Sequence, residues 1–511
     1  MTRRIEVIGG GPAGLYAARL LKLKHPELDV VVYERMRGEA ETFGFGVGLT
    51  ESTMRNLQAA DPETADRVRE ASFAGHDLRL KGPGSAVILH GARNLAIGRA
   101  TLLGILGSAA VAVGVEVRHG AEADPGTATA DVVIAADGVR SATRQKLSAE
   151  LGERTSLGRS RFVWCGAGFA VDSAFFTAVT QGDGMFVVHA YPYAADRSTF
   201  LIEVDEQTWR EAGLDDFDRN TPPGQTDQAS VGLLEELFTD ELHGRPLLTN
   251  RTRWSRFTDL TLDRWSAGNI ALVGDAAHTA HYTLGSGTKL AMEDAIALAE
   301  ALVGEESVPA AFASYEQARR PPVERFKRLA RRSQAWWDTY RLRSSWPADR
   351  LAVSYMTRSG NLTLADYAAD QPEATRRALS WLGSAVPRDA GALDGWVLSR
   401  PLPDPAVRLR RRAITRDALD AVSAVDEVRW DHPDVWDKTA DDTIVRLGAG
   451  AGRPVLLTGP DDPEQIPARV DFAERLRLQT SRCVGVELPG ADRSQAATAV
   501  AAGRADFVVL R

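Results

Sequence analysis

Three glycines near the amino terminus constrain the fold of this chain more than any other feature. Gly9, Gly11 and Gly14 lie between an apolar segment at residues 4–8 and an Ala/Leu-rich segment at residues 15–24. This spacing between a strand and a helix is typical of a dinucleotide-binding turn. The first glycine permits the tight turn, the second admits a pyrophosphate, and the third lets the helix pack closely on the sheet. The amino end of that helix then faces the phosphates.

An acidic residue follows at the position where such a fold binds a ribose. Residues 28–33 predict a second strand, and Glu34 ends it, twenty positions beyond Gly14. A carboxylate there is placed to accept hydrogen bonds from a ribose diol. Because strand, helix and acidic residue fall in register, we predict dinucleotide binding, although this pattern alone does not separate FAD from NAD.

A second glycine-rich region indicates which dinucleotide is bound. Residues 269–273 predict a buried strand that ends in Gly274 and Asp275, and residues 285–289 (Gly-Ser-Gly-Thr-Lys) precede another predicted helix. An acidic side chain at a strand end can hold a ribityl hydroxyl. The amino end of a helix carries partial positive charge, which suits the electron-rich edge of a reduced flavin. The two motifs together favour FAD.

The periodicity of the sequence changes along the chain and divides it into regions. Residues 161–204 alternate in polarity and are rich in aromatics, which predicts an inserted antiparallel sheet. We therefore predict an α/β protein whose FAD-binding part is doubly wound and Rossmann-like. Its FAD-binding and helical regions are 1–160 and 255–385, its β-sheet substrate domain is 161–254, and a small C-terminal α/β region is 390–511.

The composition argues against several classes of function. A net charge of −8 over 511 residues lacks the basic character that a nucleic-acid partner demands. Cys165 and Cys483 show no spacing typical of a metal site or a disulfide framework, so we predict no metal. No apolar run approaches the ~20 residues that span a bilayer. We expect a cytoplasmic protein without a nucleic-acid or membrane partner.

Three motifs in this order resemble the class A FAD-dependent aromatic hydroxylases, the 4-hydroxybenzoate-hydroxylase-like family. Residues 274–278 (Gly-Asp-Ala-Ala-His) resemble the second FAD motif of the family. Residues 136–141 (Ala-Asp-Gly-Val-Arg-Ser) resemble its Asp-Gly motif, which is associated with FAD and the reduced nicotinamide cofactor. Together with the first glycine turn, the resemblance covers about residues 1–385.

Shorter segments resemble one branch of that family, the hydroxylases of aromatic acyl-CoA thioesters. They include residues 43–47 (Phe-Gly-Phe-Gly-Val), 161–164 (Arg-Phe-Val-Trp) and 278–281 (His-Thr-Ala-His). This branch contains salicylyl-CoA 5-hydroxylase and the N-terminal half of 2-aminobenzoyl-CoA monooxygenase. The chain departs from the hydroxybenzoate branch, which has a Pro-Pro pair where this sequence has Thr279-Ala280-His281-Tyr282.

The resemblance implies a monooxygenase that uses FAD, NADH or NADPH, and O2. NAD(P)H reduces the flavin, O2 forms a C4a-hydroperoxide, and the ring of a small aromatic substrate takes up the distal oxygen. An aromatic acyl-CoA thioester is the leading substrate class. Oxygenation of an indole or polycyclic natural-product intermediate is the alternative, and a FAD-binding oxidase or reductase without oxygen transfer is the alternative of another class. A homodimeric assembly is left open.

Carried over residue by residue, the resemblance assigns the cofactor site to the turns and loops of these motifs. The predicted FAD-binding residues are Gly9, Gly11, Pro12, Ala13, Gly14, Glu34, Arg35, Phe45, Gly46, Arg99, Asp137, Asp275, Gly285, Gly287 and Thr288.

The inserted sheet is expected to hold the substrate. The predicted substrate contacts are Trp164, Phe186, Tyr191, Phe200 and Glu203. His189 and His281 are the candidate catalytic acid/base groups, because imidazole titrates near neutral pH. A role for His189 as a hydrogen-bonded wall residue is equally open.

The C-terminal region carries a second, weaker resemblance. Residues 472–476 and 501–510 look like the last units of a barrel-type flavin reductase domain that some acyl-CoA hydroxylases carry. About 110 residues cannot form an eight-stranded barrel, which takes about 250. We predict a shortened barrel relic that caps or dimerises, with a thioredoxin-like appendage as the alternative.

Overall fold

The computed structural model describes residues 3–37, 45–91, 95–126, 129–222, 224–285, 287–421, 423–450 and 452–511. Phe43 and Gly44 of the predicted 43–47 motif and Ser286 of the second glycine loop lie outside the described residues. The chain divides into two compact units. The first consists of Met1–Arg79 and His90–Arg331, and the second of Leu80–Leu89 and Arg332–Arg511.

The first unit is built on a six-stranded sheet with the order β16-β17-β9-β1-β2-β8. Its strands are β1 (Arg4–Ile8), β2 (Asp29–Glu34), β8 (Glu116–His119), β9 (Val132–Ala135), β16 (Ser266–Ala267) and β17 (Ile270–Leu272). All pairs are parallel except β16 with β17. Strands β9 and β17 are apolar along their whole length, because both faces of a parallel sheet are covered. The predicted Rossmann-like sheet is confirmed.

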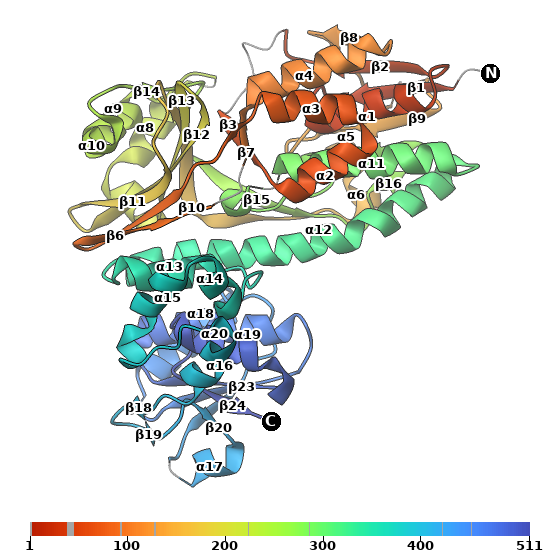
Figure 1. The fold of residues 1–511 in the computed structure, drawn as a ribbon. Helices are drawn as coiled ribbons and strands as arrows, with labels where there is room; N and C mark the ends of the chain where they lie inside the picture. The colour runs from red at the N-terminus through yellow and green to blue at the C-terminus, as the bar shows by residue number, and fades with distance from the viewer. Residues whose placement is uncertain are drawn as a thin grey trace. The chain divides into compact units, whose positions relative to one another are not determined.

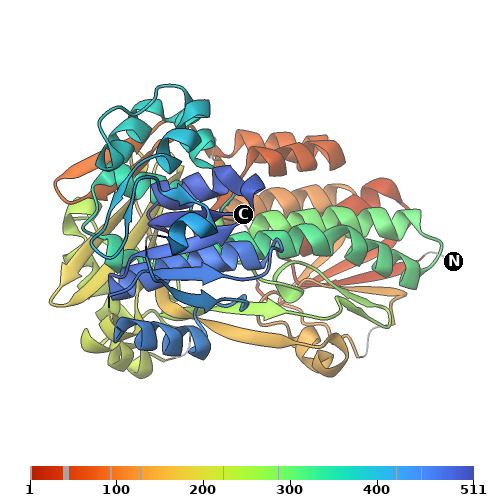
Figure 2. The same cartoon turned by 90° about the horizontal axis from the view of Figure 1, so that it is seen from below.

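The helices of this sheet bring the two glycine motifs together. Helix α1 (Pro12–Lys24) lies between α4 (Arg99–Ala112) and α11 (Gly287–Gly304) (Figure 1). Figure 2 shows α11 beside the first part of α12 (Val308–Asp338), where Arg319 pairs with Asp294. Shorter elements complete the unit: β3 (Gly46–Leu49), α2 (Glu51–Ala60), α3 (Pro62–Glu70), β4 (Phe73–Ala74), β7 (Leu95–Gly98), α5 (Ala142–Lys146) and α6 (Ser148–Leu151).

The predicted insertion is an antiparallel sheet with the order β14-β10-β13-β12-β11, to which β15 adds beside β10. Its strands are β10 (Arg154–Ala167), β11 (Ala174–Gln181), β12 (Gly184–Ala194), β13 (Arg197–Val204), β14 (Leu247–Leu248) and β15 (Ser255–Thr261). One face packs against a helical layer formed by α7 (Glu206–Glu211), α8 (Leu214–Asn220), α9 (Gln228–Leu237) and α10 (Thr239–Leu242). The opposite face is free to form a site.

The second unit is the small C-terminal α/β region together with residues 332–385, which the sequence groups with the FAD-binding part. It contains β5 (Leu78–Gly82) from Leu80 onward and β6 (Ser85–Leu89). Its first helices are α13 (Ala348–Met356), α14 (Leu364–Asp370), α15 (Pro372–Leu379) and α16 (Ala390–Leu398). Helices α13 to α16 join this unit because α14 packs on α16 and α20.

The sheet of the second unit is entirely parallel, with the order β20-β24-β23-β22-β21. Its strands are β20 (Ala413–Ile414), β21 (Asp426–Arg429), β22 (Val455–Thr458), β23 (Val484–Leu488) and β24 (Phe507–Leu510). The connecting helices are α17 (Arg416–Asp420), α18 (Lys438–Gly448), α19 (Gln465–Thr480) and α20 (Arg493–Ala501), and β18 (Leu402–Pro403) pairs with β19 (Arg408–Leu409). Strand β20, the first of this sheet along the chain, pairs with β24, the last. The first and last strands of a closed barrel pair in the same way, but in this sheet β20 and β21 are edge strands. The barrel origin stays a prediction.

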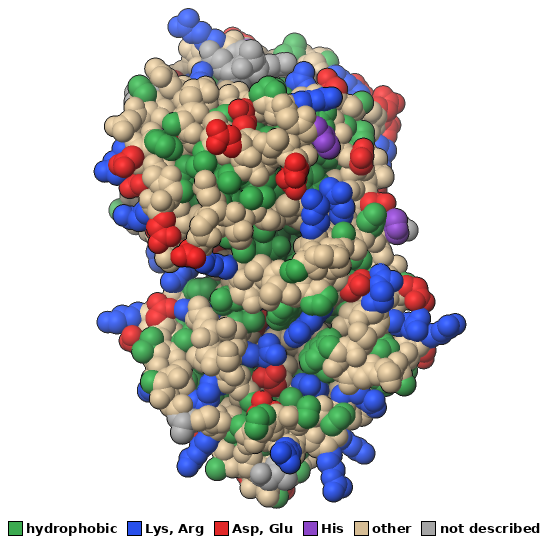
Figure 3. Space-filling view, turned by 90° about the vertical axis from the view of Figure 1, so that its left-hand side faces the viewer, with side chains coloured by type: hydrophobic (Ala, Val, Ile, Leu, Met, Phe, Trp, Pro, Cys, Tyr) green, Lys and Arg blue, Asp and Glu red, His purple; other side chains and the backbone are tan. Residues whose placement is uncertain are grey.

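The surface carries charges of both signs. On the face shown in Figure 3, acidic and basic side chains are interspersed. None of the helices in the described part of the chain has the length and apolar character needed to cross a membrane.

Candidate active site

The first glycine turn has the geometry that a bound pyrophosphate requires. Gly9 has a φ of +106°, and a Cβ there would lie 2.3 Å from the carbonyl oxygen of Ala136. A Cβ on Gly14 would lie 2.1 Å from the carbonyl oxygen of Gly9, whereas a Cβ on Gly11 would meet nothing within 4 Å. The chain itself therefore requires the first and third glycines, and the open space beside Gly11 is left for a ligand.

Glu34 holds this turn in place at the end of β2. Its carboxylate accepts hydrogen bonds from the backbone amides of Gly10 (2.7 Å) and Met36 (2.8 Å). A carboxylate has further lone pairs, so this arrangement leaves acceptor capacity for the predicted ribose. Arg35, the next residue, is exposed.

Asp275 and Arg99 lie close to the start of α11. Asp275 is exposed to solvent, yet burial among protein atoms raises the pKa of its carboxyl, an effect opposed by His278 and Arg99. A side chain that is both accessible and desolvated by its neighbours lies in a recess. Burial also lowers the pKa of Arg99, against the attraction of Asp275. A Cβ on Gly287 would lie 3.7 Å from Oδ1 of Asp275, which places the helix start beside this carboxylate.

The loop after Asp275 leads into the first turn of α11. Gly285 has a φ of +62°, a left-handed conformation that favours glycine. Thr288 follows in the helix and is partly exposed. The predicted residues Gly285, Gly287 and Thr288 thus surround the amino end of the helix on the side of Asp275.

A buried network that the sequence analysis missed fixes the turn of Asp275. Asp294 of α11 is fully buried, and its carboxylate accepts from the backbone amide of Gly274 (3.0 Å). It also pairs with His278 Nε2 (2.8 Å) and with Arg319 Nε (2.8 Å). Burial acts to raise the pKa of Asp294, but His278 and Arg319 outweigh it and lower the pKa. The ionised carboxylate therefore locks the motif to α11.

Asp137 offers an independent sign of a ligand-binding site beside the same turn. Its backbone amide lies 3.0 Å from the position of a Cβ on Gly9, and its Oδ2 accepts from the amide of Thr143 (3.1 Å). Its other oxygen, Oδ1, is buried without a hydrogen-bond partner among the described residues. Buried polar atoms are rarely left unpaired. Asp137, the open side of Gly11 and the recess of Asp275 fit a bound FAD.

Residues 45 and 46 join the nucleotide-binding part to the inserted sheet. The Tyr191 hydroxyl donates to the carbonyl oxygen of Gly46 (2.7 Å), and the Gly46 amide donates to Thr199 Oγ1 (3.0 Å). The Phe45 ring lies against Gly166, where a Cβ would approach it to 2.5 Å. Burial raises the pKa of Tyr191 to about 12. Its hydroxyl therefore stays protonated and ties two segments together.

A buried carboxylate, Glu203, stands at the centre of the open face of the sheet. His189 Nε2 lies 2.8 Å from its Oε2, and the hydroxyl of Tyr282 donates to its Oε1. Burial acts to raise the pKa of Glu203, but His189, His281 and Tyr282 together lower it. The carboxylate is therefore ionised at neutral pH. The sequence identified Glu203 and the two histidines as site residues but missed Tyr282.

His281 is buried next to this group. Burial is the main cause that lowers the pKa of His281 to about 4, against the attraction of Glu203. Its Nδ1 lies 3.1 Å from Thr283 Oγ1, and its ring packs at 4.8 Å from Phe257. The imidazole is consequently neutral in the folded protein at pH 7.

Aromatic rings lie around the ring of Tyr282. The ring of Tyr282 lies 4.8 Å from Phe162, 6.1 Å from Trp164 and 6.3 Å from Phe257, between ring centroids. Trp164 is a predicted substrate contact, whereas Phe162 and Phe257 were missed. Strand register gives the reason for the grouping, since Phe162 pairs with Glu203 across β10 and β13.

Two predicted substrate contacts lie elsewhere, which corrects the sequence-based grouping. Phe186 and Phe200 are fully buried in the apolar core between the sheet and its helical layer. Each is an odd number of positions from a residue of the site, Phe186 from His189 and Phe200 from Glu203. Side chains alternate along a strand, so an odd separation puts them on opposite faces.

Comparisons with known proteins agree with this geometry. A family model described as "FAD binding domain" matches residues 111–330. The chain is 39% identical over 374 residues to the salicyloyl-CoA 5-hydroxylase of Streptomyces sp., covering 71% of this chain and 72% of the relative. It is 38% identical over 367 residues to the 3-hydroxy-4-methyl-anthranilyl-[aryl-carrier protein] 5-monooxygenase of Streptosporangium sibiricum, covering 72% and 97%.

A solved structure supports the fold. The crystal structure of a mutant of 2-methyl-3-hydroxypyridine-5-carboxylic acid oxygenase superposes with a TM-score of 0.53 at 23% identity, covering 74% of this chain and 98% of that chain. Together with the relatives, these findings settle the class of chemistry, an oxidoreductase reaction with FAD, NAD(P)H and O2. The chain belongs to the family of FAD-dependent aromatic monooxygenases, the class A hydroxylases, that carry this FAD-binding domain.

Proposed function

We propose that this monooxygenase hydroxylates the ring of an aromatic acyl group carried on a CoA or carrier-protein thioester. The support is twofold. One relative is named for a CoA-linked aromatic substrate and the other for one linked to an aryl-carrier protein. In this chain, the open face of the inserted sheet presents aromatic walls around an ionised carboxylate, which suits a ring bearing a hydroxyl or amino group.

The FAD is assigned to the first turn, the recess of Asp275 and the Asp137 loop. When bound and reduced by NAD(P)H, FAD would activate O2 so that one of its oxygen atoms can be transferred to the ring. The chain contributes Gly11 for close approach of the pyrophosphate, Arg99 and Asp275 for polar contacts, and the amino end of α11 for partial positive charge.

The proton chemistry falls to Tyr282, Glu203 and His189. Tyr282 donates its hydroxyl hydrogen to Glu203, and a hydroxyl oxygen has lone pairs with which it can accept the proton of a ring hydroxyl of the substrate. Glu203 then takes the proton of the Tyr282 hydroxyl. His189 Nε2 stabilises Glu203 from the other carboxylate oxygen, Oε2, at 2.8 Å. Loss of that proton makes the ring more electron-rich and a better acceptor of the oxygen atom. This relay is the observation in the structure that supports the proposed hydroxylation, whereas the thioester rests on the relatives.

The walls of the site have a separate task. Phe162, Trp164 and Phe257 present apolar surface around Tyr282, and neutral His281 adds no charge to it. Such a lining excludes water and orients a flat ring at a fixed distance.

The experiment compares Glu203→Gln with Glu206→Gln, a nearby glutamate that pairs with Arg161 and Arg210 outside the site. Both proteins are given NADH or NADPH and a panel of aromatic CoA thioesters, the matching free acids, and indoles. We expect thioesters to yield products heavier by one oxygen, and turnover to fall about 100-fold or more in Glu203→Gln alone. Equal turnover of the two variants would contradict the proton relay through Glu203. Turnover of free acids or indoles but not of thioesters would contradict the proposed substrate class.

The FAD assignment has its own variant. Asp275→Ala is expected to give a folded protein with little bound flavin, because the recess loses the carboxylate that the cofactor contacts. Asp259→Ala is the control, since Asp259 pairs with Lys327 and Arg331. Flavin absorbance after purification measures the result, and full yellow occupancy of Asp275→Ala would contradict the assignment.

A further inference from the structure

Three arginines surround one aspartate at the amino edge of the parallel sheet in the second unit. Arg412 directly precedes β20, and Asp506 directly precedes β24. Both carboxylate oxygens of Asp506 are used: Oδ1 accepts from Arg477 Nε (2.7 Å), and Oδ2 accepts from the amide of Val484 (3.0 Å). Asp506 therefore neutralises Arg477 and leaves the other two arginines, Arg350 and Arg412, without a carboxylate.

Arg350 has no hydrogen bond or ion pair with any described residue. Its guanidinium lies between two indoles, with the central carbon 4.1 Å from the ring centroid of Trp346 and 4.5 Å from that of Trp381. Its Nε is buried without a partner. Burial lowers the pKa of Arg350 to about 10, helped by the positive charges of Arg477 and Arg412.

Arg412 faces the same indole. Its guanidinium carbon lies 5.2 Å from the ring centroid of Trp381, and only 5% of the residue is exposed. Nη1 donates to the backbone carbonyl of Asp506 (2.6 Å), and Nε is buried without a partner. Two guanidinium groups thus lie against one tryptophan, and neither forms an ion pair with an acidic side chain among the described residues; the nearby Asp506 attracts both, but its carboxylate is paired with Arg477.

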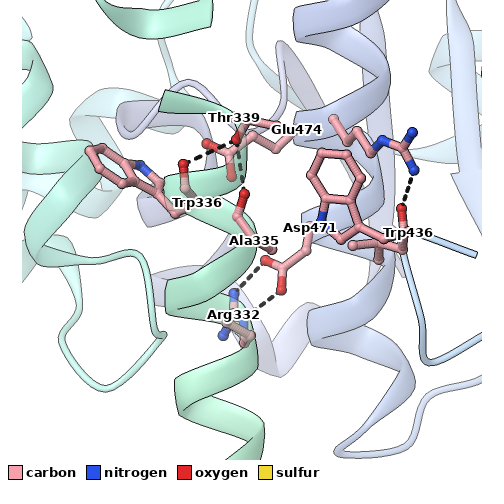
Figure 4. A pocket seen from close by; sticks show the side chains of 9 residues that line it. Arg332, Ala335, Trp336, Thr339, Trp436, Asp471 and Glu474 are labelled. Atoms are coloured by element: carbon pink, nitrogen blue, oxygen red, sulfur yellow. Dashed lines mark hydrogen bonds and ion pairs between the residues drawn. The ribbon is translucent and has the colours of Figure 1, made fainter. Parts of the chain in front are cut away.

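Several other arginines of this unit are paired with acids. Figure 4 shows Arg332, which forms two hydrogen bonds with Asp471 (2.7 and 2.9 Å). Arg475 pairs with Asp441. Arg343 pairs with Glu474 at 2.7 Å, the acid that also lines this pocket. An unpaired buried charge is costly. Arg350 and Arg412 therefore differ from their neighbours in the way expected of a site that awaits an anion.

We propose that Arg350 and Arg412 bind the phosphate group of a phosphate monoester, with Trp346 and Trp381 as the walls of the site. Two unpaired positive charges match a dianion better than a monocarboxylate. The Arg350 guanidinium lies over both indole rings, and a guanidinium presents a planar fork of N–H groups that matches a phosphate. Trp381 is 37% exposed, so the site opens to solvent at this ring.

The test uses the flavin-loaded protein and isothermal titration calorimetry. Adenosine 3′,5′-bisphosphate, inorganic phosphate and acetate are the three probes. We expect the bisphosphate to bind and acetate not to bind. If inorganic phosphate binds as tightly as the bisphosphate, the ligand of the site is free phosphate. If inorganic phosphate binds more weakly than the bisphosphate, the ligand is a phosphate monoester.

The variants are Arg350→Gln and Arg412→Gln, with Arg400→Gln as the matched control. Arg400 also stacks on a tryptophan, Trp396 at 4.8 Å, but its donors already reach the carbonyl of Trp396 and Ser399 Oγ. We expect the dissociation constant of the bisphosphate to rise about 10-fold or more in the first two and to stay unchanged in the control.

Folding is controlled by circular dichroism and by Arg350→Lys. Lysine keeps the charge but loses the fork, so we expect intermediate affinity. Binding that is absent in the parent protein, or equal in Arg350→Gln and Arg400→Gln, would overturn the proposal. This site lies in the second unit, and its test does not depend on the substrate proposed for the first.

Discussion

The glycine turn and the inserted sheet contribute to one active site but use different parts of the chain. The turn acts through its backbone: Gly9 and Gly14 allow two segments to approach, and Gly11 leaves space. The sheet acts through side chains on one face, where Glu203 and Tyr282 meet from segments about eighty positions apart. A backbone site tolerates only the residue that fits its conformation, whereas a side-chain site depends on which face a residue occupies.

The largest expected effects come from substitutions at two glycines of the turn, Gly14 and Gly11, and they test whether the turn acts through its backbone. Gly14→Ala places a Cβ 2.1 Å from a backbone oxygen, so we expect no soluble folded protein. The new Cβ of Gly11→Ala meets no atom of the described residues within 4 Å, so we expect normal folding and an FAD dissociation constant raised about 10- to 100-fold. Expression, circular dichroism and flavin titration measure both effects. A stable Gly14→Ala flavoprotein would show that the turn is not closely packed.

The two faces of the sheet provide the second, smaller contrast. Phe186→Ala removes a fully buried ring from the core, so we expect a loss of about 3–5 kcal/mol in the free energy of unfolding. Tyr282→Phe removes only a hydroxyl, so we expect stability within about 1 kcal/mol of the parent protein and turnover that falls with substrate binding retained. Urea unfolding and steady-state kinetics separate the two. A kinetic defect in Phe186→Ala without lost stability would contradict the assignment, because the substrate would then contact the face that packs against the helical layer.

The smallest expected effect concerns the pH dependence of stability. The pKa of His281 is about 4 in the folded protein, below its ordinary value of about 6.5. Between these values the unfolded chain binds a proton that the folded protein does not, so stability falls as the pH drops from 6.5 towards 4. We expect the parent protein to lose about 2 kcal/mol more than His281→Asn between pH 7.5 and pH 5.

Urea unfolding at the two pH values checks this difference. His90→Asn is the control, because the imidazole of His90 is exposed to solvent, whereas that of His281 is buried. Parallel losses in all three proteins would mean that His281 is protonated when folded, and the neutral wall that we describe would be wrong.

The sequence predicted the backbone-built parts of the site better than the side-chain parts. Gly9, Gly11 and Gly14 belong to one local motif and Asp275 to a second, and each motif stands next to the strand and helix that position it. Tyr282 was missed because its partner, Glu203, lies 79 positions earlier, in β13. No local spacing in the sequence relates the two residues.

Part of the missing information was nevertheless present. Counting odd and even positions along residues 198–204 separates Phe200 from Glu203 without any structure. The same count separates Phe186 from His189. The pairing of β10 with β13, which brings Phe162 beside Glu203, is long-range and could not be obtained from one sequence. The buried network around Asp294 was missed for the same reason.

The strand order of the second unit has a consequence for synthesis of the chain. Strand β24 lies between β20 and β23, so an inner strand of the sheet comes after the other four in the chain. On the ribosome, β20 emerges almost a hundred residues before its neighbour exists. This unit therefore cannot complete its sheet until its last strand has left the exit tunnel, and until then β20 and β23 expose unpaired edges that chaperones can recognise.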